Sequence, residues 1–162
     1  MRNLRSDNLL LYAICLTVAL ALGSCNRKAV YSHYEHTHID GWGWERSDTL
    51  TFSVPPLGEG GLFSEELGLR TTTRYPFTSL TLIVSQRVFP SGLFRNDTVT
   101  VRLTDDIGNR LGDGMNLYQH TCTLPVIQLN EHDSLSITVS HYMKRESLPG
   151  ISDIGLTVKR MQ

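Results

Sequence analysis

A cysteine near the amino terminus has the surroundings of a site for covalent lipid attachment. Cys25 follows Leu22, Gly23 and Ser24, and a leucine three residues before a cysteine, followed by small residues, is the pattern that lipoprotein peptidases accept. The chemistry would be a diacylglycerol on the Cys25 thiol and an acyl chain on its amino group. Each buried methylene contributes about 0.8 kcal/mol to membrane binding. Stable anchoring requires two membrane-binding signals, such as two acyl chains, and these lipids together supply more than that.

The residues before Cys25 fit an export signal. Arg2 and Arg5 give a positive start, and an apolar run extends from Leu9 to Leu22. A membrane-spanning helix needs about 20 apolar residues, so this run is too short to remain as one. We therefore expect a lipoprotein signal peptide over residues 1–24, a lipidated cysteine with a short tether over residues 25–29, and one domain over residues 30–162. The alternative is an ordinary signal peptide with a coincidental cysteine.

Two tryptophans form a candidate binding site. Trp42 and Trp44 lie two residues apart, so their rings point the same way if the segment is extended. With Tyr31 or Tyr34 nearby they would make a platform for a sugar ring or a contact for a protein partner. The alternative is that at least one tryptophan plugs the end of the fold.

A cluster of histidines invites a metal interpretation. His33, His36 and His38 lie close together in the sequence, but on a strand only His36 and His38 share a face. Two ligands do not complete a tetrahedral zinc site, so we expect no metal and no other cofactor.

An acidic segment allows two interpretations. Asp105, Asp106, Asn109 and Asp113 lie among glycines, and their oxygens would suit calcium. Asp and Gly at this density are also typical of a tight turn, because they tolerate positive φ and bond their own backbone. We favour the turn.

The sequence lacks recognisable signatures of catalysis. It contains no Gly-x-Ser-x-Gly elbow and no phosphate-binding glycine loop. A pair of carboxylates for glycoside hydrolysis stays open, because the separation of Asp and Glu side chains in space cannot be read from their order. We expect a protein that is not an enzyme.

Charge and cysteine content exclude nucleic-acid binding and an internal disulfide. The formal net charge is −1, with acids and bases interspersed, which excludes the basic surface that nucleic-acid binding demands. Of the three cysteines, Cys15 leaves with the signal and Cys25 takes the lipid, so no internal disulfide can form. Folding must rest on core burial. We expect Cys122 to be a buried, unreactive thiol on a strand face shared with Leu124.

The elements that position these residues are predicted to be short strands. Segments with period-two alternation are separated by Gly, Pro, Asn and Asp. The expected strands are Val30–Tyr34, Thr49–Val54, Leu67–Thr72, Leu80–Val88, Thr98–Leu103, Tyr118–Leu124, Ser134–Met143 and Gly155–Arg160. About eight such antiparallel strands can close two facing sheets, so we predict an all-β fold with a single β-sandwich domain. A barrel is the alternative.

Several short segments occur in an order typical of one family. They are the site at Cys25, Val30-Tyr31, Trp44 ahead of Asp48 and Phe52, Leu69-Arg70, Arg74-Tyr75-Pro76-Phe77, Leu80, Asp97-Thr98-Val99, Leu103 with Gly108, Leu111-Gly112-Asp113-Gly114, and Leu148-Pro149-Gly150-Ile151-Ser152-Asp153-Ile154-Gly155-Leu156. In this order the chain resembles the gliding-motility lipoproteins called GldH, of the Bacteroidetes. It departs from that pattern at Ser79, where the family usually has Asn, and between His36 and Gly43.

The resemblance implies an envelope lipoprotein needed for surface gliding, with no assigned enzymatic activity. Only Cys25 carries over as a functional residue. We expect a structural or assembly component whose partners are the membrane, through its lipid, and other envelope proteins. No acidic cluster follows Cys25, which favours an outer-membrane protein facing the periplasm. The alternatives are a glycan-binding lipoprotein, favoured by the tryptophan pair, and an unrecognised hydrolase.

Overall fold

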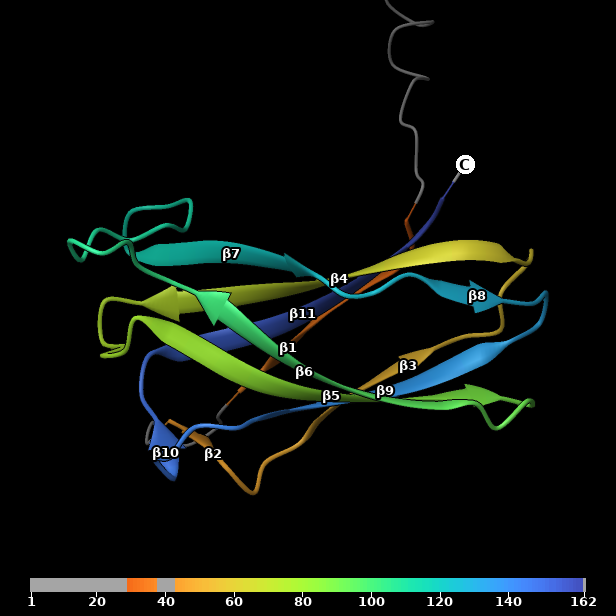
Figure 1. The fold of residues 1–162 in the computed structure, drawn as a ribbon, viewed down its shortest axis with the longest axis horizontal. Coiled ribbons are helices and arrows are strands. Elements are labelled where there is room, and N and C mark those ends of the chain that lie inside the picture. The colour runs from red at the N-terminus through yellow and green to blue at the C-terminus, as the bar shows by residue number, and fades with distance from the viewer. Residues whose placement is uncertain (1–28, 38–42, 162) are drawn as a thin grey trace, which may run out of the picture.

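The computed structural model describes residues 29–37 and 43–161, and in this part of the chain it consists of strands and loops (Figure 1). The strands are β1 (Ala29–His36), β2 (Trp44–Glu45), β3 (Leu50–Val54), β4 (Gly61–Thr72), β5 (Ser79–Phe89), β6 (Phe94–Arg102), β7 (Leu117–Thr123), β8 (Ile127–Leu129), β9 (Ser134–His141), β10 (Ser147–Leu148) and β11 (Ile151–Arg160). Over the same ranges, no helix is long and apolar enough to cross a membrane.

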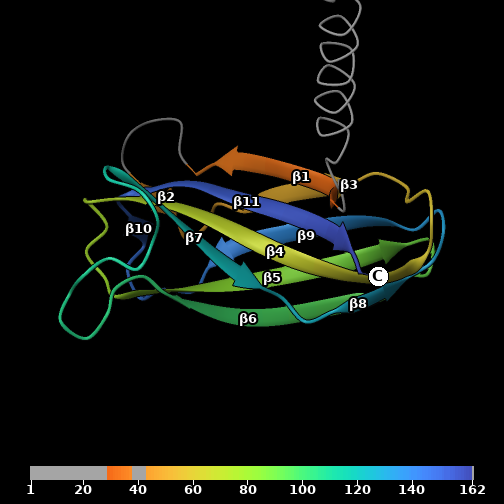
Figure 2. The same ribbon diagram turned by 90° about the horizontal axis from the view of Figure 1, so that it is seen from above.

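Two antiparallel sheets face each other across one core (Figure 2). One sheet has the order β1-β11-β4-β7, with β8 also paired to β4, and the other has the order β3-β9-β5-β6. A two-stranded pair, β10-β2, lies at one end. The prediction of an all-β sandwich is therefore confirmed.

Alternation along the strands explains why the two sheets stack. In β9, Leu135, Ile137 and Val139 are buried while the serines and threonine between them are less so. β5 repeats the pattern, with Leu80, Leu82 and Val84 fully buried. Each such side chain contributes roughly 1.5–3 kcal/mol when removed from water. Burial of these inward faces holds the layers together without a cross-link between them.

Three strands begin four or six residues earlier than the sequence predicts, while β1, β5 and β7 begin one residue earlier. β4 starts at Gly61 instead of Leu67, β6 at Phe94 instead of Thr98, and β11 at Ile151 instead of Gly155. In β4 and β6 charged residues take inward positions, since Glu65 is buried and Arg95 is only partly exposed. Charges at core positions interrupt the apolar alternation on which the prediction rests. The short strands β2, β8 and β10 were not predicted.

The sandwich has two ends that we name by one residue each. At the Ala29 end, β1 begins, β11 ends, β4 begins at Gly61, and the β5–β6 hairpin turns. At the Trp44 end lie β2, β10 and the loop between β6 and β7. β4 has 12 residues, so the two ends are roughly 40 Å apart at about 3.3 Å per residue.

Candidate functional site

Three residues singled out by the sequence lie outside the described part of the chain. They are Cys25, in the range 1–28, and His38 and Trp42, in the range 38–42. The lipidation site and one half of the tryptophan pair therefore stay predictions.

Trp44 is part of the core. Its side chain is 0% exposed, its Nε1 donates a hydrogen bond to the Asp48 carbonyl oxygen at 3.2 Å, and its ring meets His141 edge-on with centroids 5.2 Å apart. A buried indole has no free face for a sugar or a partner. Trp44 thus takes the position foreseen in the alternative interpretation, as a plug at one end of the sandwich.

A tyrosine and two glycines lie side by side on the outer face of the β1-β11-β4-β7 sheet. Tyr34 of β1 is opposite Gly155 of β11, which is opposite Gly68 of β4. A Cβ atom at Gly68 would lie 2.1 Å from the Tyr34 hydroxyl oxygen, and one at Gly155 would lie 2.5 Å from the ring. The ring therefore lies flat across two strands, in a space that only glycine leaves free.

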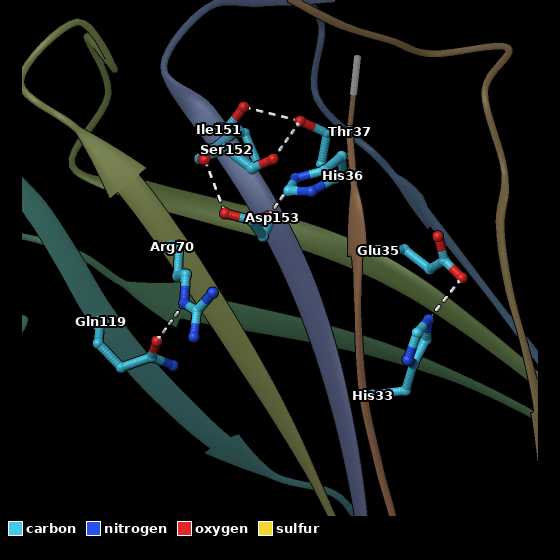
Figure 3. Close-up of polar contacts among 9 residues, drawn as sticks. All are labelled: His33, Glu35, His36, Thr37, Arg70, Gln119, Ile151, Ser152 and Asp153. Carbon is cyan, nitrogen blue, oxygen red and sulfur yellow. Dashed lines mark hydrogen bonds and ion pairs between the residues drawn. The ribbon is translucent and has the colours of Figure 1, made fainter. Parts of the chain in front are cut away.

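Arg70 and Gln119 hold this ring from the next two strands. Gln119 Nε2 donates to the Tyr34 hydroxyl oxygen at 2.9 Å, and Arg70 Nε donates to Gln119 Oε1 at 3.1 Å. The Arg70 guanidinium carbon is 4.0 Å from the centre of the Tyr34 ring, a cation–π contact. Figure 3 shows Arg70 and Gln119 reaching toward each other from neighbouring strands. We call Tyr34, Gly68, Arg70, Gln119 and Gly155 the Tyr34 surface.

A carboxylate and a histidine extend this face toward the Trp44 end. Asp153, buried on the outer side of β11, lies 2.5 Å from His36 Nδ1 and accepts a hydrogen bond from the Ser152 hydroxyl at 2.7 Å. Thr37 donates from its hydroxyl to the Ile151 carbonyl oxygen at 2.7 Å. Figure 3 shows these contacts joining the end of β1 to the start of β11.

The histidines do not gather into a metal site in the described residues. His33 bonds Glu35 at 2.9 Å and lies on the opposite face of β1 from His36, while His38 is outside the described ranges. Within residues 29–37 and 43–161, no group of three His, Cys, Asp or Glu side chains is placed to hold a metal ion.

The acidic segment forms a turn. The Asp105 carboxylate accepts hydrogen bonds from the backbone N–H groups of Ile107 at 3.0 Å and Asn109 at 2.8 Å, and from the Asn109 amide at 2.8 Å. Asp106 pairs with Arg102, and Asp113 bonds Gln119 through its backbone. The Asp105 oxygens that calcium would need are used by the turn itself.

A cluster of charged and amide groups is buried between the sheets. Glu65 of β4 is 0% exposed and accepts hydrogen bonds from Gln86 Nε2 at 2.7 Å and Arg95 Nη2 at 2.8 Å. Arg95 also lies 2.7 Å from Asp97. Burial raises the pKa of the Glu65 carboxyl, and the bonds from Gln86 and Arg95 offset this only in part.

This cluster holds two carboxylates, those of Glu65 and Asp97. It therefore bears on the alternative of a hydrolase, which would need a pair of carboxylates. Glu65 and Asp97 share Arg95, and Glu65 Oε1 and Gln86 Oε1 are among the buried side-chain atoms of the described residues that have no hydrogen-bond partner. A proton on Glu65 would turn one of these acceptors into a donor, in keeping with its raised pKa. We read the cluster as a buried polar network, not as a pair of groups flanking a substrate.

The thiol of Cys122 is half-buried on the inner side of β7, close to the core. Burial raises its pKa, which lowers the fraction of reactive thiolate. Cys122 is thus less buried than expected, and its lack of reactivity stays a prediction.

The Tyr34 surface is not predicted by the sequence. Its members come from four separate segments, and Tyr34 and Gln119 are 85 residues apart. One signal was present: Gly68 and Gly155 lie inside predicted strands, where a glycine often marks the close approach of another group.

Comparison with known proteins places the chain among envelope lipoproteins. The family model described as GldH lipoprotein matches residues 29–158. The chain is 25% identical over 154 residues to the gliding motility lipoprotein GldH of Flavobacterium johnsoniae, covering 91% of this chain and 94% of that one. It is 22% identical to the GldH homologue of Christiangramia forsetii, covering 91% and 93%.

Similarity to solved structures is weaker. A family 35 carbohydrate-binding module from Clostridium thermocellum superposes with a TM-score of 0.44 at 14% identity, covering 81% of this chain and 92% of that one. This likeness is too distant to say anything about ligands.

Proposed function

Because this chain belongs to the GldH lipoprotein family, we propose that it is a lipid-anchored, non-enzymatic component of a cell-envelope assembly associated with gliding motility. It is held to the membrane through Cys25 and works by binding other envelope proteins. We place it in the outer membrane, facing the periplasm. The support comes from the family match, from the sequence around Cys25, and from the ordered Tyr34 surface.

The Tyr34 surface is the observation that carries the binding role. Tyrosine and arginine, together with tryptophan, are enriched among the residues that dominate the binding energy of protein interfaces. Here Tyr34 is held by Gln119 and faced by Arg70 before any partner arrives. A side chain that is already ordered loses little conformational entropy on binding. A flat, preformed face on a sheet suits a protein partner better than a small substrate, which needs a concave site.

The anchor is tested on the native protein. Mass spectrometry of the mature chain should show an amino-terminal Cys25 carrying a thioether-linked diacylglycerol and an amide-linked acyl chain. Cys25→Ser should leave the membrane fraction or remain unprocessed. An unacylated native amino terminus would refute the anchor.

The binding role is tested by isolating the tagged full-length protein from solubilised membranes of its own host. Tyr34→Ala and Arg70→Ala should lose envelope proteins that the wild type retains, because each removes one half of the stacked pair. Thr98→Ala, on the exposed face of the other sheet, is the matched control and should retain them. Equal recovery from all four proteins would count against the Tyr34 surface as the contact.

A further inference from the structure

The Ala29 end carries exposed apolar side chains that the proposed function does not use. In the β5–β6 hairpin, Phe89 is 45% exposed, Leu93 52% and Phe94 57%. Other exposed apolar residues near the same end are Val30, Leu62, Val126 and Met161. Apolar groups that gather on one part of a surface mark a place where that surface is covered.

Chain length puts this end beside the membrane. Ala29 pairs with Lys159, which pairs with Ser64, three residues inside the start of β4. The residue Ala29 itself therefore lies about 10 Å inside the outermost point of this end of the sandwich, which is marked by the start of β4. Residues 25–28 span at most about 14 Å when extended. Residues 25–28 are thus long enough for a lipid on Cys25 to reach the plane of the Ala29 end, whereas the Trp44 end, with exposed Ile107 and Met115, lies a whole strand length farther away.

The chemistry of the hairpin suits the interface of a phospholipid bilayer. The Arg87 guanidinium carbon lies 5.8 Å from the centre of the Phe94 ring. Both residues line a hollow of about 290 Å³, together with Ser85, Gln86, Phe89, Ser136 and Thr138. Phenylalanine rings enter the boundary between headgroups and acyl chains, and a neighbouring arginine reaches the lipid phosphates. Arg27 and Lys28, next to Cys25 in the sequence, add charge of the sign that anionic headgroups attract.

We propose that the β5–β6 hairpin, through Phe89, Leu93 and Phe94, is a second membrane contact that inserts into the headgroup region of the bilayer in which Cys25 is anchored. The inference rests on the proposed lipid anchor and goes beyond it, since an acyl chain alone leaves the domain free to rotate. Two contacts fix which end faces the lipid. The sheet face that carries the Tyr34 surface is then roughly perpendicular to the membrane plane. The Trp44 end points away from the membrane.

The test uses the full acylated protein in vesicles that contain phosphatidylcholine brominated near the headgroup end of its acyl chains. Leu93→Trp places an indole in the hairpin, and Met115→Trp places one at the Trp44 end as the matched control. The unsubstituted protein supplies the background from its own tryptophans. We expect bromine to remove about half or more of the emission added by Leu93→Trp, since interfacial side chains lie roughly 5–10 Å into the boundary. The emission added by Met115→Trp should be unaffected.

A second pair of variants tests the aromatic residues. Adding Phe94→Asp to Leu93→Trp should bring the quenching down to the level of Met115→Trp, because a carboxylate resists entry beside lipid phosphates. Adding Thr98→Asp, farther along the same face of β6, should leave it unchanged.

Two results would overturn the proposal, and they differ in meaning. Equal, weak quenching for Leu93→Trp and Met115→Trp in protein whose mass shows the acyl chains would mean that the hairpin faces solvent or another protein, with the anchor intact. Absence of the acyl chains from that mass spectrum would remove the anchor, and the hairpin contact with it.

Discussion

The Tyr34 ring lies across Gly155, so close that a Cβ atom at position 155 would stand 2.5 Å from ring carbon Cε1. The two residues face each other on β1 and β11, and the guanidinium carbon of Arg70, on β4, lies 4.0 Å from the centre of the ring. The glycine therefore decides where the tyrosine rests. It also makes the edge strand β1 dependent on a residue far away in the sequence.

Gly155→Ala should destabilise the protein by about 1–3 kcal/mol, the usual cost of forcing a group into a filled site. In a Tyr34→Ala background the same change should cost much less, because the clash is gone. Urea unfolding of the four proteins in this double-mutant cycle measures the coupling. Additive effects would show that Tyr34 does not rest on Gly155 in solution.

Trp44→Ala should lower the free energy of unfolding by about 3–5 kcal/mol, as large core truncations do. Tyr142→Ala, at a position that is 68% exposed, should change it by less than about 0.5 kcal/mol. Chemical denaturation followed by circular dichroism provides both values. A small effect of Trp44→Ala would mean that this indole is available on the surface after all.

Stability should fall as the pH rises above the ordinary pKa of a glutamate. Because the Glu65 pKa is raised in the folded protein, the folded state keeps its proton in a range where the unfolded state has lost it. In that range the folded state binds more protons, so the unfolding free energy decreases with increasing pH. The window extends from about 4.5, the ordinary value, up to the folded pKa.

Glu65→Gln should flatten that slope, since the titrating group is gone. Ser64→Ala, at the neighbouring outward position of β4, should keep the slope of the wild type. Thermal melts over a pH series compare the three proteins. A wild-type slope that persists in Glu65→Gln would assign the pH dependence to another group.

Asp105→Ala should speed hydrogen exchange at the amides of Ile107 and Asn109, because both donate to this carboxylate. Asp106→Ala removes a carboxylate from the same loop without touching these bonds and should leave the exchange rates unchanged. Adding calcium to the wild type should not slow the two amides. Calcium-dependent protection that disappears in Asp105→Ala would revive the calcium interpretation of this loop.

Much of the fold could be predicted from the sequence because the central strands alternate without interruption. β9 and β5 place an aliphatic residue at nearly every inward position, which is the signal that period-two reasoning detects. β4 could not be delimited in this way, since Glu65 occupies an inward position that the pattern reserves for apolar residues. A buried charge is explained only by its partners, and Gln86 and Arg95 lie on other strands.

The candidate site was less accessible to sequence reasoning. The paired tryptophans drew attention because exposed aromatics bind ligands, but spacing alone does not report burial, and Trp44 is in the core. Tyr34 was considered only as a neighbour of that pair. Its role depends on Gly68, Gly155 and Gln119 meeting across three other strands, and such pairings are set by the tertiary structure.

The antiparallel pairing of β1 with β11 has a mechanical consequence. β1 is the first described strand after the predicted anchor, and it pairs with β11 from Ala29 to His36. Hydrogen bonds in such a ladder run perpendicular to the strands, so a pull directed along β1 from its Ala29 side loads them in shear, all at once. A ladder strained in this direction resists far more tension than one peeled open bond by bond, because its bonds share the load.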